Sequence, residues 1–432
     1  MIPREQTGRL SPEYPLFTGH SGAVLDLDFS PFNDNLIASC SEDSTIKIWQ
    51  VPQQMTEDIS TPLLTLKKHQ RKVSNVLFHP VASNVLASSS FDQSIRLWDL
   101  EKETDRVCLQ EFPEAVCSFA FNVSGSLICS TSKDKRVRVH DAHSGKAVAE
   151  AEGHAGVKTT RITWMGDSPY FLTTGFSRTS ERQMTVWDSR QMGATGGVKT
   201  EMLDSSSGLL MPFFDADTNV LFLAGKGDGN IRYWEFVNGS LFFLAEFQSS
   251  CSQKGMGWMP KRGVGVLDNE IALMFKVCSS WIEPVSFRVP RKSDVFQPDI
   301  FAPTSSSEPA LTAEQFFGGA NAKPLTMTFD EGLGQWKEPT SKNSSLAKSI
   351  CKTIDSAKAQ EKKPEPAKTA AVQAEHCKIS SPKLANALNA SESPKLWTPL
   401  HKDLCVTDEL IMLKKRVVEL EGKVEYLMMN KK

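Results

Sequence analysis

The sequence of 432 residues lacks several features that define large classes of protein. No stretch approaches the ~18 uninterrupted apolar residues of a membrane-spanning helix, and the opening MIPREQTGRL lacks the apolar core of a secretory signal. The charges nearly cancel, with 49 Lys and Arg against 51 Asp and Glu, so no global field attracts nucleic acid or an acidic membrane. We therefore expect a cytoplasmic protein with no transmembrane segment and no nucleic acid partner.

The sequence also lacks the patterns typical of catalytic and metal-binding sites. The nine cysteines form no C-x-x-C pair and no cluster with histidine at metal-ligand spacing, so we expect reduced thiols. There is no glycine-rich phosphate loop and no isolated catalytic set. We predict no enzymatic activity, no catalytic residues, no metal and no cofactor.

A repeat dominates the first three hundred residues. The set His20, Ser39, Asp43 and Trp49 recurs 49 residues later with the same steps of 19, 4 and 6. Short runs with strand character, such as VLDLDFSP and NLIASCS, lie between these residues. The step of six from Asp to an anchor residue recurs further along the chain, and we expect a last instance at Asp268 and Met274.

The anchor positions of the repeat predict the fold class. Positions 49, 98, 140, 187, 234 and 274 are separated by 40 to 49 residues, an interval typical of four-stranded propeller blades. We predict an all-β propeller with six readable WD blades over residues 1–290.

The residue types of the repeat predict a buried polar relay that stabilises each blade. Asp accepts from His, and His reaches a Ser hydroxyl that also meets the Trp indole, so every buried polar group has a partner. A catalytic Ser–His–Asp set is the alternative, but two copies at identical spacing favour structure, because an active site is needed once. The predicted relay residues are His20, Ser39, Asp43, Trp49, His69, Ser88, Asp92, Trp98, Asp134, His154, Trp187, Asp228 and Trp234.

The fourth repeat has a longer turn. Thr173 and Trp187 are 14 residues apart, whereas Ser39 and Trp49 are 10 apart. The extra residues include Arg178 and Arg182, which either pair with nearby acids in a solvated turn or contact a partner, because loops on a rigid scaffold often carry function.

Several runs resemble the coronins, WD-repeat proteins that bind filamentous actin. These runs are TTGFSRTSERQMTVWD (173–188), LDSSSGLLMPFFDADTNVLFLAGKGDGNIRYWEF (203–236), KGMGWMPKRGVGV (254–266) and VPRKSDVFQPDIFAP (289–303). The resemblance covers roughly residues 1–335 and implies a seven-blade propeller, actin binding, contact with the actin-branching complex, and a place in the actin cytoskeleton at the cell cortex.

Comparison with the family pattern also indicates one departure, a closing strand and an extension. Met1–Pro3 resembles the last strand of a first blade that is otherwise absent, so we expect free sheet edges or a gap in the ring. Residues 282–290 are predicted to be a closing strand. Residues 291–336 resemble the extension that packs on coronin propellers, with Phe301, Phe316, Phe317 and Phe329 as apolar anchors.

Basic residues on the loops and strands are the candidate actin contacts. Arg136 and Arg138 alternate with valines and so share a strand face, which makes them the best cluster. The full set is Lys133, Lys135, Arg136, Arg138, Arg178, Arg182, Lys226, Arg232, Lys261, Arg262, Arg291 and Lys292.

Residues 337–404 are predicted to form a disordered linker. From 337 to 396 there is no Phe, Tyr or Trp, and Ala, Lys, Ser, Glu and Pro dominate, so ordering has no compensating core. Between 337 and 400 there are 11 Lys and 6 acidic residues, so this segment carries a net positive charge. The charge fits either a solvated spacer or a segment that contacts an acidic filament. Ser381 and Ser393 precede prolines and are candidate phosphorylation sites.

Residues 405–430 are predicted to form a coiled coil. Apolar residues recur at alternating steps of four and three, which is the seam of a heptad repeat. Arg416 and Glu421 fall at g and e, a pattern of parallel trimers, so self-association as a trimer is favoured over a dimer or tetramer. The oligomerisation residues are Leu410, Leu413, Arg416, Val417, Leu420, Glu421, Val424 and Leu427.

Two functions fit these features. The first is actin-filament binding with bundling or crosslinking, in which the coiled coil gathers several weakly binding propellers. The alternative is a general propeller adaptor that recruits a protein partner in membrane trafficking or signalling.

Overall fold

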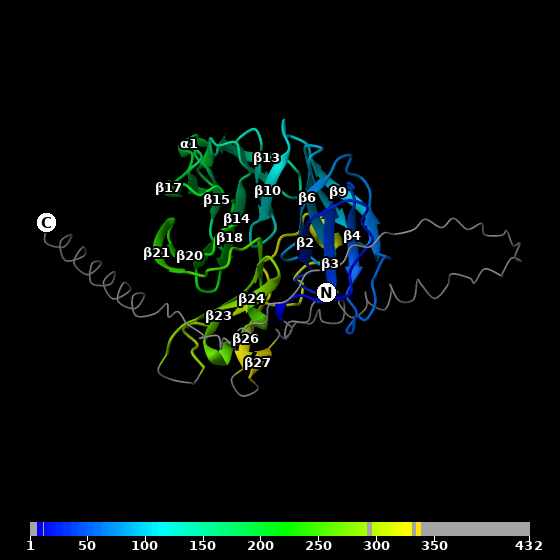
Figure 1. Cartoon of the computed structure of the whole chain (residues 1–432). Helices are drawn as coiled ribbons and strands as arrows, with labels where there is room; N and C mark the ends of the chain where they lie inside the picture. The colour runs from blue at the N-terminus through cyan, green and yellow to red at the C-terminus, as the bar shows by residue number, and fades with distance from the viewer. Residues whose placement is uncertain (1–6, 12, 292–295, 331–333, 338–432) are drawn as a thin grey trace, which may run out of the picture. The chain divides into compact units, whose positions relative to one another are not determined.

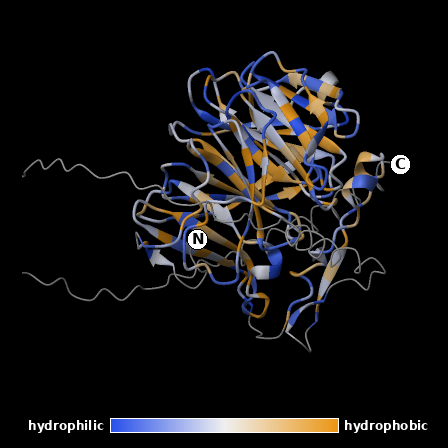
Figure 2. Cartoon of the chain, turned by 90° about the vertical axis from the view of Figure 1, so that its right-hand side faces the viewer, coloured by the Kyte–Doolittle hydropathy of each residue, from blue (hydrophilic) through white to orange (hydrophobic). Residues whose placement is uncertain are grey.

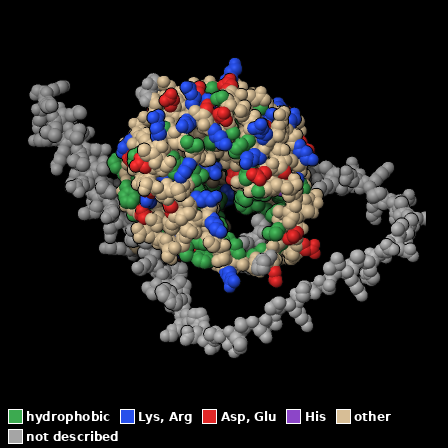
Figure 3. Space-filling view, turned by 45° about the horizontal axis from the view of Figure 1, so that its top comes forward, with side chains coloured by type: hydrophobic (Ala, Val, Ile, Leu, Met, Phe, Trp, Pro, Cys, Tyr) green, Lys and Arg blue, Asp and Glu red, His purple; other side chains and the backbone are tan. Residues whose placement is uncertain are grey.

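The computed structural model describes residues 7–11, 13–291, 296–330 and 334–337. Within these residues the chain forms six antiparallel sheets of four strands and one sheet of three. The four-stranded sheets follow one another around a central opening (Figures 1 and 3). The predicted all-β propeller with six WD blades is therefore confirmed.

The first three blades are simple meanders, in which consecutive strands pair. Blade 1 contains β2 (Val24–Phe29), β3 (Leu36–Ser41), β4 (Ile46–Gln50) and β5 (Leu64–Leu66). Blade 2 contains β6 (Val73–Phe78), β7 (Val85–Ser90), β8 (Ser94–Asp99) and β9 (Thr104–Leu109). Blade 3 contains β10 (Val116–Phe121), β11 (Leu127–Ser132), β12 (Arg136–Asp141) and β13 (Ala147–Glu152).

The next two blades follow the same plan. Blade 4 contains β14 (Arg161–Trp164), β15 (Tyr170–Phe176), β16 (Arg182–Asp188) and β17 (Lys199–Asp204), and the short helix α1 (Met192–Thr195) lies between its last two strands. Blade 5 contains β18 (Leu210–Asp215), β19 (Val220–Gly225), β20 (Ile231–Val237) and β21 (Ser240–Phe247). Apolar residues concentrate in the strands, and hydrophilic residues concentrate in the connections (Figure 2).

Blade 6 joins the two ends of the propeller. It contains β22 (Gly255–Trp258), β23 (Glu270–Val277), β24 (Trp281–Arg288) and the N-terminal strand β1 (Gly8–Arg9). Gly8 pairs with Ile282 and Arg9 with Trp281, so β1 is the outer strand of this blade. The predicted closing strand at 282–290 instead corresponds to the third strand, β24, and β1 closes the blade.

The last anchor of the repeat was also misplaced. Met274 lies in the second strand of blade 6, whereas the other anchors lie in third strands. The cause is the long connection 259–269 between β22 and β23, which contains two short 3-10 turns, η1 (Lys261–Gly263) and η2 (Val266–Asp268). Because of these added residues, the second and third strands of blade 6 lie later in the sequence than the regular repeat interval predicts.

One flank of blade 1 is exposed. Leu27 and Phe29 on β2 are 57% and 45% exposed, whereas Val76 and Phe78, at the corresponding positions of β6, are 0% and 7% exposed. Blade 1 covers Val76 and Phe78. Among the described residues no blade covers β2 in this way, although an ion pair between Arg262 and Asp34 links the loops of blades 6 and 1. The expected gap therefore takes the form of an uncovered apolar flank.

The extension packs against the propeller at two places. It contains β25 (Thr304–Ser305), α2 (Ala313–Phe317), β26 (Thr326–Asp330) and β27 (Gln335–Lys337). Phe316 is buried against blades 2 and 3, and Phe317 packs beside it. Phe301 is buried in the core cluster of blades 5 and 6, and Phe329 packs against that cluster. All four expected anchors thus contact the propeller.

The remaining predicted segments lie outside the described residues. These are Met1–Pro3, Lys292, the linker after residue 337 and the coiled-coil segment 405–430 with its oligomerisation residues from Leu410 to Leu427.

Candidate protein-binding face

The predicted relay is present in blades 1 and 2 with the same geometry. In blade 1, His20 Nδ1 is 2.8 Å from Asp43, His20 Nε2 is 2.8 Å from the Ser39 hydroxyl, and the Trp49 indole donates to that hydroxyl at 2.8 Å. Burial disfavours the charged form of Asp43, but hydrogen bonds from Thr45 and His20 hold the pKa of its carboxyl well below the usual range.

Blade 2 repeats these contacts through His69, Asp92, Ser88 and Trp98. Ser88 is fully buried, so its hydroxyl has no route to a substrate. The relay ties the connection entering each blade to the turn between its second and third strands, which is a structural role.

Blade 4 uses a variant of the relay that the sequence did not reveal. His154 Nε2 is 2.8 Å from the Thr173 hydroxyl, which also accepts from Trp187 at 2.8 Å. Gln183 takes the place of the aspartate, with its amide nitrogen 2.7 Å from His154 Nδ1. Gln183 lies four residues before Trp187, so the expected step of six from the partner to the tryptophan did not identify it.

In blades 3 and 5 arginine replaces histidine as the partner of the aspartate. Asp134 accepts from Arg138 at 2.5 Å, and Asp228 accepts from Arg182 at 2.5 Å. Trp234 of blade 5 is buried at 4% exposure by packing. His140 of blade 3 stands at the tryptophan position, fully buried, and neither ring nitrogen has a hydrogen-bond partner in the described part of the chain.

A chain of ion pairs joins blades 4 and 5. Arg182 donates to Asp204 at 2.6 Å as well as to Asp228, and Arg232 donates to Asp204 at 2.6 Å and to Glu246 at 2.9 Å. Burial disfavours the charged form of Asp204, but these donors keep the pKa of its carboxyl far below the usual range. The side chain of Arg182 is only 3% exposed, so its contacts are internal.

Other candidate contacts are also held in ion pairs. Arg136 and Arg138 both reach Glu150 at 2.9 Å, as expected for a shared strand face, but Arg138 is buried. The Lys261 side chain is 8% exposed and lies 2.5 Å from Asp215. Two further candidates also have acidic partners, namely Arg262 with Asp34 and Arg291 with Asp299.

Four candidates are exposed on one face of the propeller. We call it the turn face, because it carries the turns between second and third strands. The connections between blades lie on the same face, since a meander returns to it after its fourth strand. Lys133 and Lys135 are in the turn of blade 3, Arg178 is in that of blade 4 and Lys226 is in that of blade 5.

The connections between blades add basic residues that the sequence reasoning missed. Lys67, Lys68, Arg71 and Lys72 enter blade 2, Lys158 enters blade 4 and Lys254 enters blade 6. Their position in the repeat identifies them, because they flank the relay histidines or the first strand of a blade. The four exposed candidates and these six residues together form what we call the basic face. Figure 3 shows Lys and Arg side chains spread around the ring, with hydrophobic side chains nearer its opening.

Aromatic rings position part of the basic face. The Phe91 ring lies between Lys72 at 4.6 Å and Lys133 at 4.9 Å, and thereby links blades 2 and 3. Lys158 lies 4.4 Å from the Phe176 ring and donates to the Ser207 carbonyl at 2.9 Å. Such cation–π contacts hold the ammonium groups at the surface in fixed positions.

Comparison with known proteins supports the fold and identifies the family. Residues 13–50, 60–99 and 106–141 match the WD domain, G-beta repeat, and residues 282–324 match a type of WD40 repeat. Coronin-A from Dictyostelium discoideum is 51% identical over 336 residues, which cover 77% of this chain and 74% of coronin-A. This chain belongs to the coronin family.

Further relatives agree with this assignment. A coronin-like protein from Schizosaccharomyces pombe is 43% identical over 394 residues, which cover 89% of this chain but only 63% of that coronin. The chain thus spans less than two thirds of that relative. The crystal structure of the WD40 domain from Toxoplasma gondii coronin superposes with a TM-score of 0.69 at 32% identity, covering 74% of this chain and 82% of that one.

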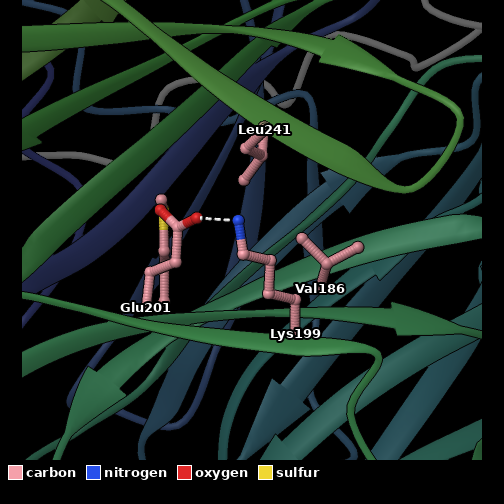
Figure 4. Close-up of a pocket in the computed structure, with 5 residues that line it drawn as sticks. Val186, Lys199, Glu201 and Leu241 are labelled. Carbon is pink, nitrogen blue, oxygen red and sulfur yellow. Dashed lines mark ion pairs between the residues drawn. The ribbon is translucent and has the colours of Figure 1, made fainter.

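In this coronin the recess in Figure 4 is a weaker candidate site than the basic face. It lies between blades 4 and 5 and is lined by Met184, Val186, Lys199, Glu201 and Leu241. Lys199 and Glu201 neutralise each other across 2.5 Å. The recess leaves no room for even a water-sized molecule, whereas small-molecule sites begin at ~300 Å³.

Neither a candidate membrane-spanning helix nor a candidate metal site is found in the part of the chain that the structure describes. None of its helices has the length and hydrophobicity that crossing a membrane requires. Its His, Cys, Asp and Glu residues form no group suited to hold a metal ion.

Proposed function

We propose that this coronin binds actin filaments through the basic face and bundles them by self-association, without enzymatic activity. The basic face supports the proposal: it carries lysines and arginines from several blades on one side of the propeller. An acidic filament surface is the kind of partner that such a face attracts, because complementary charge accelerates encounter and fixes orientation. The place of action is the cytoplasm, at the actin cytoskeleton and cell cortex.

The predicted coiled coil at 405–430 supplies the bundling step. A single propeller that binds through exposed charges binds weakly, because each exposed ion pair contributes only about 0–1 kcal/mol. Linking several propellers, with a trimer favoured, makes the second contact intramolecular and raises the overall affinity. The same segment is the proposed contact for the actin-branching complex.

Charge reversal tests the binding face. Lys133→Glu with Lys135→Glu places negative charge on the turn face, and Lys102→Glu with Lys146→Glu makes the same change in exposed turns of the opposite face. We expect the first pair to weaken co-sedimentation with actin filaments at least tenfold and the second pair to leave it nearly unchanged. Equal loss from both pairs argues against a specific face.

Substitution in the coiled coil tests bundling separately. Leu413→Asp with Leu420→Asp disrupts the predicted seam, whereas Lys415→Asp changes an outer position of the same helix. We expect the seam variant to pellet with filaments at high speed but to lose low-speed bundles, and the outer variant to retain both. If the wild-type chain fails to pellet at low salt, actin binding is refuted and the adaptor alternative gains support.

A further inference from the structure

The outer strand of each blade has an open edge. In the described part of the chain this strand pairs with one neighbour only, because it stands at the end of its sheet. Such an edge presents unpaired backbone N–H and C=O groups, which can pair with a strand of another chain. Soluble proteins prevent this pairing with short edge strands or with charged side chains along them. The outer strands can therefore be compared by the protection that each one carries.

Five of the six outer strands are protected in one of these ways. β1 has two residues and β5 has three. β9 carries Asp105 and Arg106, β13 carries Glu150 and Glu152, and β17 carries one lysine and two acidic residues. Each of these edges is thus too short or too charged to be a good template for strand pairing.

The outer strand of blade 5, β21, lacks this protection. Its eight residues, SLFFLAEF, make it the longest of the six, and they include no proline and no lysine. The carboxylate of Glu246, its one charged residue, accepts from Asn230 at 2.7 Å and from Arg232 at 2.9 Å, so it is drawn toward β20 and away from the open edge. β21 contains a bulge, but β9, β13 and β17 contain one as well, so the bulge adds no special protection.

Two aromatic side chains of β21 are exposed. Phe242 and Phe243 are 51% and 54% exposed, whereas Leu241 and Leu244 of the same strand are buried. The Phe243 ring packs edge-on against Trp234 at a centroid distance of 5.5 Å, which holds the ring in place. β21 lies at the rim of the propeller (Figure 1). Because this strand leads toward the turn face, the two rings lie in the half of it that is farther from the basic face.

The open edge of β21 is complementary to a second copy of itself. Two identical strands can pair antiparallel about a two-fold axis, which places the same surface of each copy against the other. With the axis at Phe242, Glu246 faces Asn238 of the other copy, and with the axis at Phe243 it faces Ser240. Like charges therefore do not meet. Either axis also brings phenylalanines of the two copies together, and such cross-strand aromatic pairs stabilise antiparallel sheets.

We propose that two copies of this chain associate through the open edge of β21, which joins blade 5 of each copy into one continuous sheet. A single strand pair buries less surface than a standard protein interface, so the dimer should dissociate on dilution. The contact lies at the rim, so the basic face stays open to a filament. It is separate from the predicted coiled coil and does not depend on actin binding.

Sedimentation velocity tests the proposal on the full-length seam variant, Leu413→Asp with Leu420→Asp, in which the predicted coiled coil does not contribute. We expect the average mass to rise from that of a monomer toward that of a dimer over a concentration series that reaches the high micromolar range. Phe243→Lys in this background places a charge on the edge and should weaken the association at least tenfold. The matched control Val148→Lys changes a side chain of β13 that is 63% exposed and should leave the association unchanged.

Hydrogen exchange provides a second measurement, which needs no substitution in β21. We expect the amides of residues 240–247 to become more protected as the concentration of the seam variant rises, and circular dichroism checks that each variant is folded. The proposal is overturned if the seam variant is a monomer throughout the series, or if Phe243→Lys and Val148→Lys associate equally. Protection of residues 240–247 without a change in mass also overturns it, and shows that another segment of the same chain covers the edge.

Discussion

Arg182 of blade 4 donates from Nη1 to the carboxylate of Asp228 in the turn of blade 5, at 2.5 Å. The same guanidinium makes a bidentate contact with Asp204 of its own blade through Nε and Nη2, at 2.6 Å each. One buried side chain therefore joins the two blades, although the sequence placed it among the exposed contacts for a partner.

Removing this arginine should weaken the propeller. Arg182→Ala leaves two carboxylates without their main donor, and breaking a buried ion pair from one side costs about 3–5 kcal/mol. Thermal unfolding followed by circular dichroism measures the loss. The matched control is Arg178→Ala in the exposed part of the same turn, which should change stability by less than about 0.5 kcal/mol. Equal effects of the two variants contradict the structural role.

The relay predicts a contrast between two buried serines. Ser88→Ala deprives both His69 and Trp98 of a hydrogen-bond partner, which should cost about 2 kcal/mol. Ser130 occupies the same strand position in blade 3, but its hydroxyl has no partner among the described residues. Ser130→Ala should therefore be neutral within about 0.5 kcal/mol, and chemical denaturation of both variants provides the comparison. A large loss in Ser130→Ala would show that its hydroxyl is bonded.

Acid should destabilise the protein through His79. Burial lowers the pKa of this imidazole to about 3, so it stays neutral in the folded chain while the unfolded chain binds a proton below about 6.5. The free energy of unfolding should fall as pH decreases from 6.5 toward 3, by up to about 1.4 kcal/mol per pH unit from this group.

The slope of stability against pH isolates this contribution. His79→Gln should flatten the slope in that window, and the control His376→Gln, outside the described residues, should not. Burial raises the pKa of Asp28 to about 7, so this carboxyl changes the free energy of unfolding with pH in the opposite direction. Because Asp28 is present in both variants, its effect cancels when their slopes are compared. An unchanged slope in His79→Gln would mean that this imidazole protonates normally in the folded chain.

The exposed flank of blade 1 should tolerate polar residues that blade 2 does not. Leu27→Ser changes a side chain that is 57% exposed and should cost less than about 1 kcal/mol, whereas Val76→Ser buries a hydroxyl at the equivalent site and should cost about 3 kcal/mol. Leu27→Ser should also reduce binding of a hydrophobic dye. Unchanged dye binding would show that the flank is covered in solution.

The local pattern of the sequence was sufficient for the blades. The spacing of His20, Ser39, Asp43 and Trp49 predicts both the strands and their hydrogen bonds, because a short turn fixes which residues of neighbouring strands face each other. The phenylalanines of the extension were recognisable for a similar reason: large apolar side chains in a polar segment need a core to cover them.

The contacts between blades were decided by the tertiary structure. The sequence could not show that Arg182 meets Asp228, that Gln183 replaces an aspartate, or that β1 closes blade 6, since these partners are far apart or out of register with the repeat. It also could not separate exposed from buried basic residues. The reason is physical: side-chain chemistry and spacing act locally, whereas burial and ion pairing depend on which segments the closed ring brings together.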